Sequence, residues 1–480
     1  MEIIILISKI KNKIKKFYME KNINQLNSSN INDNKLISYC FGLFGIASLL
    51  AWNAIIAQIP FFSYYLNSLN PSVSFPLLNK LFNIPLQFIL LIKKKLFPLK
   101  LQLIVSIIIS IICLISLPCF VFLSETNKHL GMSATIMLVL IMGLINASLQ
   151  NGFLSLTSHF PLDKIVFYST GQGISGIIMA LLELVVLFYV NTGNTDEDFK
   201  YGAFIFFGIS VLILILVIFA LIFLFNSDYG KYYLSNEKNN KEMIKETINN
   251  IINENSTNDN ASTDENLSIK VYQMEKVNII KPKIEIKQEK KYWFFELIHS
   301  VKDAIFLIWF NFFITFSVYP SVYIGQNLFS TGKFKTNIII LIFCFCNTFG
   351  RYVMKYFKPN KKLGYQIILG RTVLVILLIF NHYCNIIIKV STYATSIFLI
   401  INLVFLSGTN GFDSSLCFGL GPTLVKGEYK GKAGSAVSLF QVIGGVCGSS
   451  FAFVTQKINI IILVLNFPVP NKFCPIYTLG

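Results

Sequence analysis

Long apolar runs separated by short polar turns make up most of the chain from residue 39 onward. Eleven of these runs are long enough to cross a bilayer, because a membrane-spanning helix needs roughly 20 predominantly apolar residues. They cover residues 39–66, 75–92, 101–123, 132–157, 165–190, 201–225, 304–328, 336–357, 367–388, 391–419 and 433–454. A further run, 458–467, is too short to cross and is expected to lie at the membrane interface. The pattern predicts an all-α integral membrane protein with eleven transmembrane helices.

One long polar segment divides these helices into six and five. It is rich in Lys, Glu, Asn and Ser and poor in aromatic residues, so it cannot bury a core and is expected to be largely disordered. We therefore expect five regions in the chain. They are a tail at 1–38, a six-helix bundle at 39–225, the disordered loop at 226–296, a five-helix bundle at 297–456 and a second tail at 457–480.

The lysines in and beside the short turns predict how the helices are oriented. Twelve of them fall on the side that also holds the N-terminus, and six, including Lys80 just within the second span, fall on the opposite side. Because cytosolic loops carry an excess of Lys and Arg, the N-terminus and the central loop are expected in the cytosol. An odd number of spans then places the C-terminal tail on the extracytosolic side.

Composition excludes several classes of protein. Hydrophobic residues make up 54% of the 480 residues and charged residues only 14%, whereas soluble domains have about 45–50% and 25%. The net charge of +17 comes largely from lysines clustered between apolar runs, so it indicates topology and not nucleic-acid binding. The nine cysteines form no Cys-x-x-Cys pair, so neither a metal site nor a disulfide framework is indicated.

Residues 407–450 hold the most informative pattern, two apolar flanks crowded with Gly, Ser and Ala around a basic turn. Small residues let lipid-embedded helices approach closely. We therefore expect these two spans to pack on each other, with Gly434, Gly444, Gly445 and Gly448 along a contact surface. Asp413 lies within the first flank, and a carboxylate at membrane depth is typical of a transport pathway.

The motifs in this region resemble the last two spans of the equilibrative nucleoside transporters. The matching residues are Asn410-Gly411-Phe412, Ser414-Ser415, Gly421-Pro422, Glu428, Ala433-Gly434 and the glycines from Gly444 to Gly448, preceded in the same order by Trp52-Asn53, Gln150, Gly171-Gln172-Gly173 and Tyr319-Pro320-Ser321. The resemblance implies a 6+5 arrangement similar to the major facilitator fold and alternating access. It implies a carrier and not an enzyme, with nucleosides or nucleobases (purines favoured) as substrate, no cofactor, and the plasma membrane as its location. Facilitative transport and coupling to protons both remain open.

Arg351 is the first candidate for binding this substrate. It lies deep in the span 336–357, four residues beyond Asn347 and on the same helical face. An arginine at membrane depth is normally paired or faces a cavity, and its planar five-donor fork suits ribose hydroxyls or base acceptors. The family pattern has Asp at the position of Asn347. Asn can still bind a nucleoside by hydrogen bonds, but it cannot carry a proton or neutralise Arg351.

Two other acidic residues lie at membrane depth, Asp413 and Glu183. We hypothesise that Asp413 supplies the missing carboxylate by pairing with Arg351 or with Arg371, whose main role we expect to be tethering helices. The alternative is that Asp413 caps a locally broken helix beside Gly411.

Trp52, Asn53 and Gln150 complete the candidate site. A nucleoside site needs an aromatic or apolar wall and a few amide or hydroxyl partners. Trp52 is a candidate for the wall, and Asn53 and Gln150 are candidates for contacts to the base edge or the sugar. By residue type alone, Trp52 would be read as an interfacial anchor and Gln150 as an interhelical hydrogen bond.

Three other functions are weighed against this one. A membrane-bound acyltransferase is disfavoured because His159 and Asp163 have three residues between them and not the four of an acyltransferase His-Asp site. A sugar or drug facilitator would need twelve spans, and so a real crossing at 458–467. A channel would need a repeated pore signature, which the sequence lacks.

Overall fold

The structure is a computed structural model, and it describes residues 31–66, 71–92, 98–189, 196–234, 294–319, 323, 335–388, 392–425 and 429–466. Throughout these ranges the regular structure is helical. Most of the expected N-terminal tail, of the central loop and of the C-terminal tail lies outside them, as does the basic turn at 426–428.

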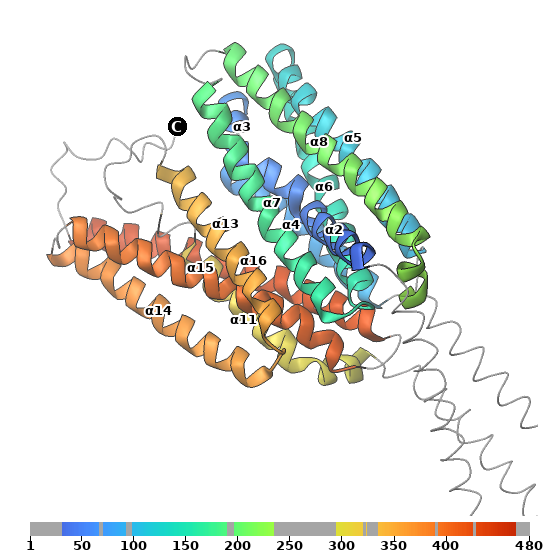
Figure 1. The fold of residues 1–480 in the computed structure, drawn as a ribbon. Coiled ribbons are helices and arrows are strands. Elements are labelled where there is room, and N and C mark those ends of the chain that lie inside the picture. The colour runs from blue at the N-terminus through green and yellow to red at the C-terminus, as the bar shows by residue number, and fades with distance from the viewer. Residues whose placement is uncertain are drawn as a thin grey trace, which may run out of the picture.

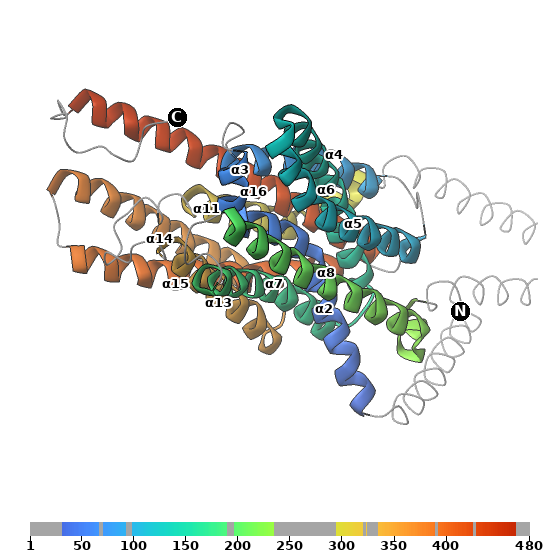
Figure 2. The ribbon, with the colours of Figure 1, turned by 90° about the horizontal axis from the view of Figure 1, so that it is seen from above.

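The helices form one N-terminal and one C-terminal group (Figures 1 and 2). The first group is α2 (Ile31–Ala57), α3 (Ile59–Tyr65), α4 (Pro71–Ile92), α5 (Leu99–Thr126), α6 (Lys128–Thr157), α7 (Leu162–Tyr189) and α8 (Asp196–Asn226). The second group is α11 (Lys302–Val318), α13 (Lys335–Val353) with the short 3-10 helix η3 (Met354–Tyr356), α14 (Lys361–Ile388), α15 (Thr392–Thr423) and α16 (Tyr429–Asn466).

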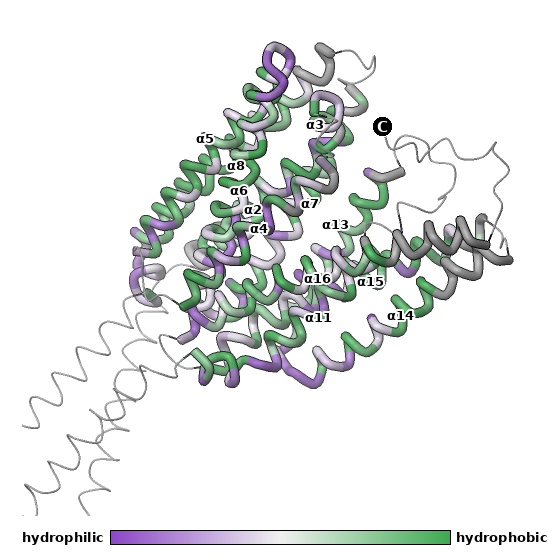
Figure 3. The backbone as a smooth tube through the Cα atoms, turned by 180° about the vertical axis from the view of Figure 1, so that it is seen from behind, coloured by the Kyte–Doolittle hydropathy of each residue, from purple (hydrophilic) through white to green (hydrophobic). Residues whose placement is uncertain are grey.

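The number of spans agrees with the sequence prediction. Ten described helices are long and apolar enough to cross a membrane, and the number is eleven if the bent pair Phe294–Ser300 and Lys302–Val318 counts as one span. The outer helices carry large apolar side chains on their exposed faces, such as Ile112 on α5 and Phe219 on α8. Figure 3 shows that hydrophobic residues run along both helices. A soluble protein would bury such faces, whereas lipid can cover them.

Prolines explain where two spans differ from single straight helices. The first expected span, 39–66, is divided at Gln58 into α2 and α3, because Pro60 has no N–H to continue the hydrogen-bond ladder of α2. The seventh expected span is represented by α11, which ends at Val318 with Tyr319 in an extended conformation, as expected before Pro320. The rest of its expected extent, to residue 328, lies almost wholly outside the described residues.

The last helix corrects the expectation for the end of the chain. Residues 458–466 continue α16 without a break as far as Asn466. The expected boundary at residue 456 therefore falls inside a helix. Nothing in the apolar sequence around residue 456 stops the helix, since the next proline is Pro468.

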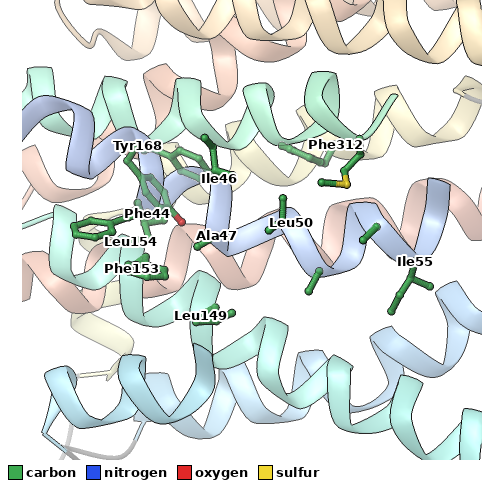
Figure 4. Close-up of a cluster of buried hydrophobic side chains, with 14 of the residues drawn as sticks. Phe44, Ile46, Ala47, Leu50, Ile55, Leu149, Phe153, Leu154, Tyr168 and Phe312 are labelled. Carbon is green, nitrogen blue, oxygen red and sulfur yellow. The ribbon is translucent and has the colours of Figure 1, made fainter. Parts of the chain in front are cut away.

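Close backbone contacts at glycines hold each group together. In the N-terminal group, a Cβ placed on Gly45 of α2 would clash with the carbonyl oxygen of Tyr168 on α7. The same contact recurs in the C-terminal group, where Gly411 of α15 lies against the carbonyl of Asn347 on α13. Apolar side chains such as Phe44 and Phe153, whose rings stack 5.1 Å apart, fill the space between α2 and α6 (Figure 4).

The glycines of α16 form a contact surface as predicted, but with a different partner. Gly444 and Gly448 lie against the backbone carbonyls of Trp309 and Phe313 on α11. Gly434 lies against α6. The expectation that the last two spans pack on each other through these glycines is therefore wrong. The sequence pattern identified the surface but could not say which helix covers it.

The two groups touch where α7 begins and α13 ends. A Cβ on Gly173 of α7 would clash with Thr348 of α13, and Ser435 of α16 donates a hydrogen bond to Asn151 of α6 at 3.1 Å. The ribbons of α7 and α13 converge toward this end in Figure 1. Lysines gather at this end, with Lys164 near the start of α7, Lys358 in the turn between α13 and α14, and Lys361 at the start of α14.

Candidate functional site

Arg351 lies in the last turn of α13, at the junction of the two helical groups. Its side chain is buried, and its Nη1 donates hydrogen bonds to three oxygens on α7. These are the carbonyl of Ser169 at 3.1 Å, the hydroxyl of Ser169 at 2.9 Å and Oε1 of Gln172 at 2.9 Å. The guanidinium is therefore directed toward the other half of the molecule and away from lipid.

The Gly171-Gln172-Gly173 motif explains how α7 can approach both neighbours here. Gly171 lies against the backbone of α2 and Gly173 against Thr348 of α13. Gln172 between them accepts from Arg351 and donates to the hydroxyl of Ser48 on α2 at 3.2 Å. The two glycines remove the side-chain bulk, and the glutamine links the helices that this brings close together.

A second helix of the C-terminal group reaches the same point on α7. The hydroxyl of Ser415 on α15 donates to the hydroxyl of Ser169 at 2.7 Å. We call Arg351, Ser169, Gln172 and Ser415 the inter-half clamp. All four are buried, so these hydrogen bonds are shielded from water and favour the state in which this end is closed.

Asn347 lies one turn before Arg351 and is held by a chain of amides. Its Oδ1 accepts a hydrogen bond from Asn410 of α15 at 3.0 Å. Oδ1 of Asn410 in turn accepts from Asn311 of α11 at 3.1 Å and from Thr315 at 2.9 Å. The Nδ2 of Asn347 donates to no residue that the structure describes, so one amide donor stays available next to Arg351.

Arg371 is buried inside the C-terminal group and connects three of its helices. From α14 its Nη1 donates to the carbonyl of Leu406 and to the hydroxyl of Thr409 on α15, both at 2.8 Å. Its Nη2 donates to the hydroxyl of Thr315 on α11. These contacts tie helices within one half.

Asp413 does not form the expected pair with either arginine. It is fully buried on α15, and among the described residues neither carboxylate oxygen has a hydrogen-bond partner. The guanidinium groups of Arg351 and Arg371 are instead occupied by neutral oxygens. Asp413 also lies within a continuous helix, α15, so it does not cap a break beside Gly411.

Glu183 lies in the N-terminal group, away from the clamp. Its Oε2 accepts a hydrogen bond from Nε2 of Gln58 at 2.6 Å. Gln58 is the residue at which α2 gives way to α3. The buried carboxylate of Glu183 therefore has a partner, and that partner is at the break in the first span.

Trp52 and Asn53 lie on α2 of the N-terminal group, and Gln150 lies on α6. Nδ2 of Asn53 on α2 donates to Ser175 of α7 at 3.0 Å. Gln150 of α6 accepts from Gln87 of α4 at 3.4 Å. Trp52 is half-buried, and no described contact joins these three side chains to Arg351.

The structure adds a polar strip on α4 that the sequence analysis did not single out. Asn79, Asn83 and Gln87 recur every four residues and are buried, and the amide atoms of Asn79 and Nδ2 of Asn83 have no described partner. Lys80, taken above for a lysine of the outer side, lies within the helix with its Nζ 5.7 Å from the ring centroid of Trp52. The four-residue spacing of amides inside an apolar span is the signal that could have revealed this strip.

Among the described residues, no group of three or more His, Cys, Asp or Glu side chains could hold a metal ion. The polar groups that converge at membrane depth are amides, hydroxyls and guanidinium groups. Such groups can bind a neutral polar solute through hydrogen bonds.

Solved structures similar to this chain are transporters of the major facilitator type. The proton:xylose symporter XylE, bound to 6-bromo-6-deoxy-D-glucose, is 12% identical with a TM-score of 0.61, covering 90% of each chain. A bacterial homologue of the iron transporter ferroportin, in an outward-facing state, is 12% identical with a TM-score of 0.54, covering 89% of this chain and 95% of the other. The transporter FucP, in an outward conformation, is 13% identical with a TM-score of 0.51, covering 89% and 93%. These identities show a shared fold and no more.

Sequence comparison identifies the family. No curated protein matches the chain significantly. The sequence model of the family described as nucleoside transporter matches residues 135–457, which is more than half of the 480-residue chain. The fold and this match together indicate a multi-pass membrane carrier and not an enzyme. The chain belongs to the nucleoside transporter family.

Proposed function

We propose that this carrier moves nucleosides and nucleobases, purines in preference, across the plasma membrane. The observation that carries the proposal is the position of Arg351, buried between the two halves with Asn347 one turn away on the same helix. Only Nη1 of Arg351 bonds to α7, and Nη2 donates to no described residue. A guanidinium with donors to spare suits the hydroxyls of ribose or the acceptor atoms of a base.

The remaining residues supply the other contacts that a nucleoside needs. Trp52 offers an aromatic wall for the base, and Gln150 and Asn53 offer amides for the base edge or the sugar. These three side chains are uncharged, so they would bind the base and the sugar through stacking and hydrogen bonds. A substrate held between Trp52 in one half and Arg351 in the other would contact both halves at once.

Alternating access follows from this placement. We take residues 39–225 and 297–456 as two units that rock against each other around the bound substrate. The inter-half clamp closes the end that carries the lysine-rich turns, and we assign this end to the cytosol. Breaking the clamp opens the site to the cytosol, and remaking it returns the carrier to the state described here.

Uptake into vesicles tests this function. Vesicles containing the purified protein are expected to accumulate labelled adenosine and hypoxanthine faster than uridine, and all three faster than protein-free vesicles. Unlabelled xylose should not compete. Uptake no greater than in protein-free vesicles would refute nucleoside transport, and competition by xylose would favour a sugar carrier.

Proton coupling depends on Asp413 in this proposal, since Asn347 cannot carry a proton. An unpaired carboxylate in a buried site is costly, and Asp413→Asn removes the charge at nearly constant volume. We expect the variant to melt at a higher temperature than the native protein and to lose any stimulation of uptake by an inward proton gradient. Glu183→Gln is the comparison, because Glu183 has a hydrogen-bond donor and its neutralisation should lower the melting temperature. If Asp413→Asn lowers the melting temperature as Glu183→Gln does and keeps the gradient response, Asp413 has no coupling role.

A further inference from the structure

We propose that Lys80 selects the base of the substrate, favouring bases that carry an oxo group over bases that carry an amino group at the same position. The proposal rests on the nucleoside transport proposed above and concerns which nucleosides bind. It predicts a preference for inosine and guanosine over adenosine, and for uridine over cytidine.

The first step is the unusual position of Lys80. It lies within the span Ser74–Ile92 and is half-buried. It forms no ion pair or hydrogen bond with a residue that the structure describes. Placing a lysine at membrane depth costs free energy, and such a residue usually marks a functional site. A lysine without a partner at this depth is therefore suited to bind a ligand.

The second step is the aromatic surface beside it. Nζ of Lys80 lies 5.7 Å from the ring centroid of Trp52, the residue proposed above as the wall for the base. Bases of every kind stack on aromatic rings, so the stacking itself does not discriminate between them. The amino group of Lys80 lies beside the ring of Trp52, so it is positioned to hydrogen-bond with the edge of a base stacked on that ring.

The third step is the polar strip that continues from Lys80 along α4. Gln87 follows seven residues later, which places it within about 20° of Lys80 around the helix and ~10 Å further along it. At that level Gln87 donates to Gln150 of α6. If the base lay beside Lys80 and Trp52, the sugar would lie near the amides of Gln87 and Gln150. One nucleoside could then contact both pairs of side chains.

The chemistry of the lysine then determines which base fits. A lysine amino group in its charged form donates hydrogen bonds and accepts none. Guanine presents two neighbouring acceptors, O6 and N7, to such a group, and hypoxanthine has the same two atoms. Adenine presents N7 beside an N6 amino donor, which would face the donors of Lys80. Among pyrimidines the contrast is between the O4 acceptor of uracil and the N4 donor of cytosine.

Uptake ratios test the inference in reconstituted vesicles. For the native protein we expect inosine to be taken up about 10-fold or more in preference to adenosine, the discrimination typical of a two-acceptor contact. The uridine-to-cytidine ratio should exceed one by a smaller factor, because only one acceptor is involved. In Lys80→Met the inosine-to-adenosine ratio is expected to fall close to one. Lys128→Met, at an exposed lysine at the start of α6, should keep the native ratio.

A change in the ligand tests the same contact without a mutation. In 7-deazainosine the N7 acceptor is missing, so the native protein should take it up several times more slowly than inosine. Equal uptake of the two by the native protein, or a native inosine-to-adenosine ratio in Lys80→Met, overturns the role of Lys80 but leaves nucleoside transport intact. Absence of nucleoside uptake by the native protein instead refutes the function on which the inference rests.

Discussion

Arg351→Ala is expected to reduce adenosine uptake by about 100-fold or more. The alanine removes three hydrogen bonds from a charged donor to α7, and hydrogen bonds to charged groups contribute about 1.5–3 kcal/mol each. A loss of ~3 kcal/mol already changes an equilibrium about 100-fold. The closed state of the clamp loses this stabilisation, and the proposed contact to substrate is lost as well. Initial uptake rates in vesicles, at equal amounts of folded protein, measure the effect.

Two further variants separate the roles of Arg351. Arg351→Lys keeps the charge but loses the planar fork, so it should transport at an intermediate rate and bind adenosine more weakly. Ser415→Ala removes the 2.7 Å hydrogen bond to Ser169 without touching Arg351, and it should change uptake more than equilibrium binding. If Arg351→Lys transports and binds like the native protein, the guanidinium neither locks the halves nor contacts the substrate.

The sequence could predict the helices because their signal is local. An apolar run of about 20 residues is recognisable without knowing its neighbours, and the described part of the chain has ten or eleven candidate spans in the expected places. Local rules also account for the break at Gln58 and the end of α11, since each lies beside a proline. The partner of a helix face is not a local property. The small-residue face of α16 could be predicted, but its packing against α11 could not.

The same distinction between local and non-local properties applies to the candidate site. Arg351 and Gln172 each stand out as unusual within an apolar span, but they lie 179 residues apart, and no helical periodicity connects them. The expected pairing of Asp413 followed from charge alone. It was wrong because Nη1 of each arginine donates instead to backbone carbonyls and hydroxyls of neighbouring helices, and neither guanidinium donates to Asp413. Lys80 was misread because charge near the end of a predicted span resembles a topology signal, and only the structure places its amino group beside Trp52.

Gly411→Val is expected to prevent the protein from folding. A Cβ at Gly411 would clash with the carbonyl oxygen of Asn347 and lie 3.0 Å from the backbone nitrogen of Arg351. Both are backbone atoms of α13, so no side chain can move aside to make room. The helices α13 and α15 would have to separate, which would also break the hydrogen bond between Asn347 and Asn410. Fluorescence-detected size-exclusion chromatography of the tagged protein should show the loss of the monodisperse peak.

Gly370 of α14 provides the matched control, because nothing lies within 4 Å of a Cβ placed there. Gly370→Ala should fold normally and be up to about 1 kcal/mol more stable, the usual gain of Ala over Gly inside a helix. Gly411→Ala adds a single methyl group between α15 and α13. We expect a smaller yield of folded protein and a lower rate of transport. The atoms that a side chain at position 411 would displace belong to Asn347 and Arg351. A variant that still folds in part should therefore lose a larger fraction of its transport than of its stability. Normal folding and transport by Gly411→Val would mean that α13 and α15 are not in backbone contact, and Asn347 and Arg351 would then lack the rigid support on which the proposed site depends.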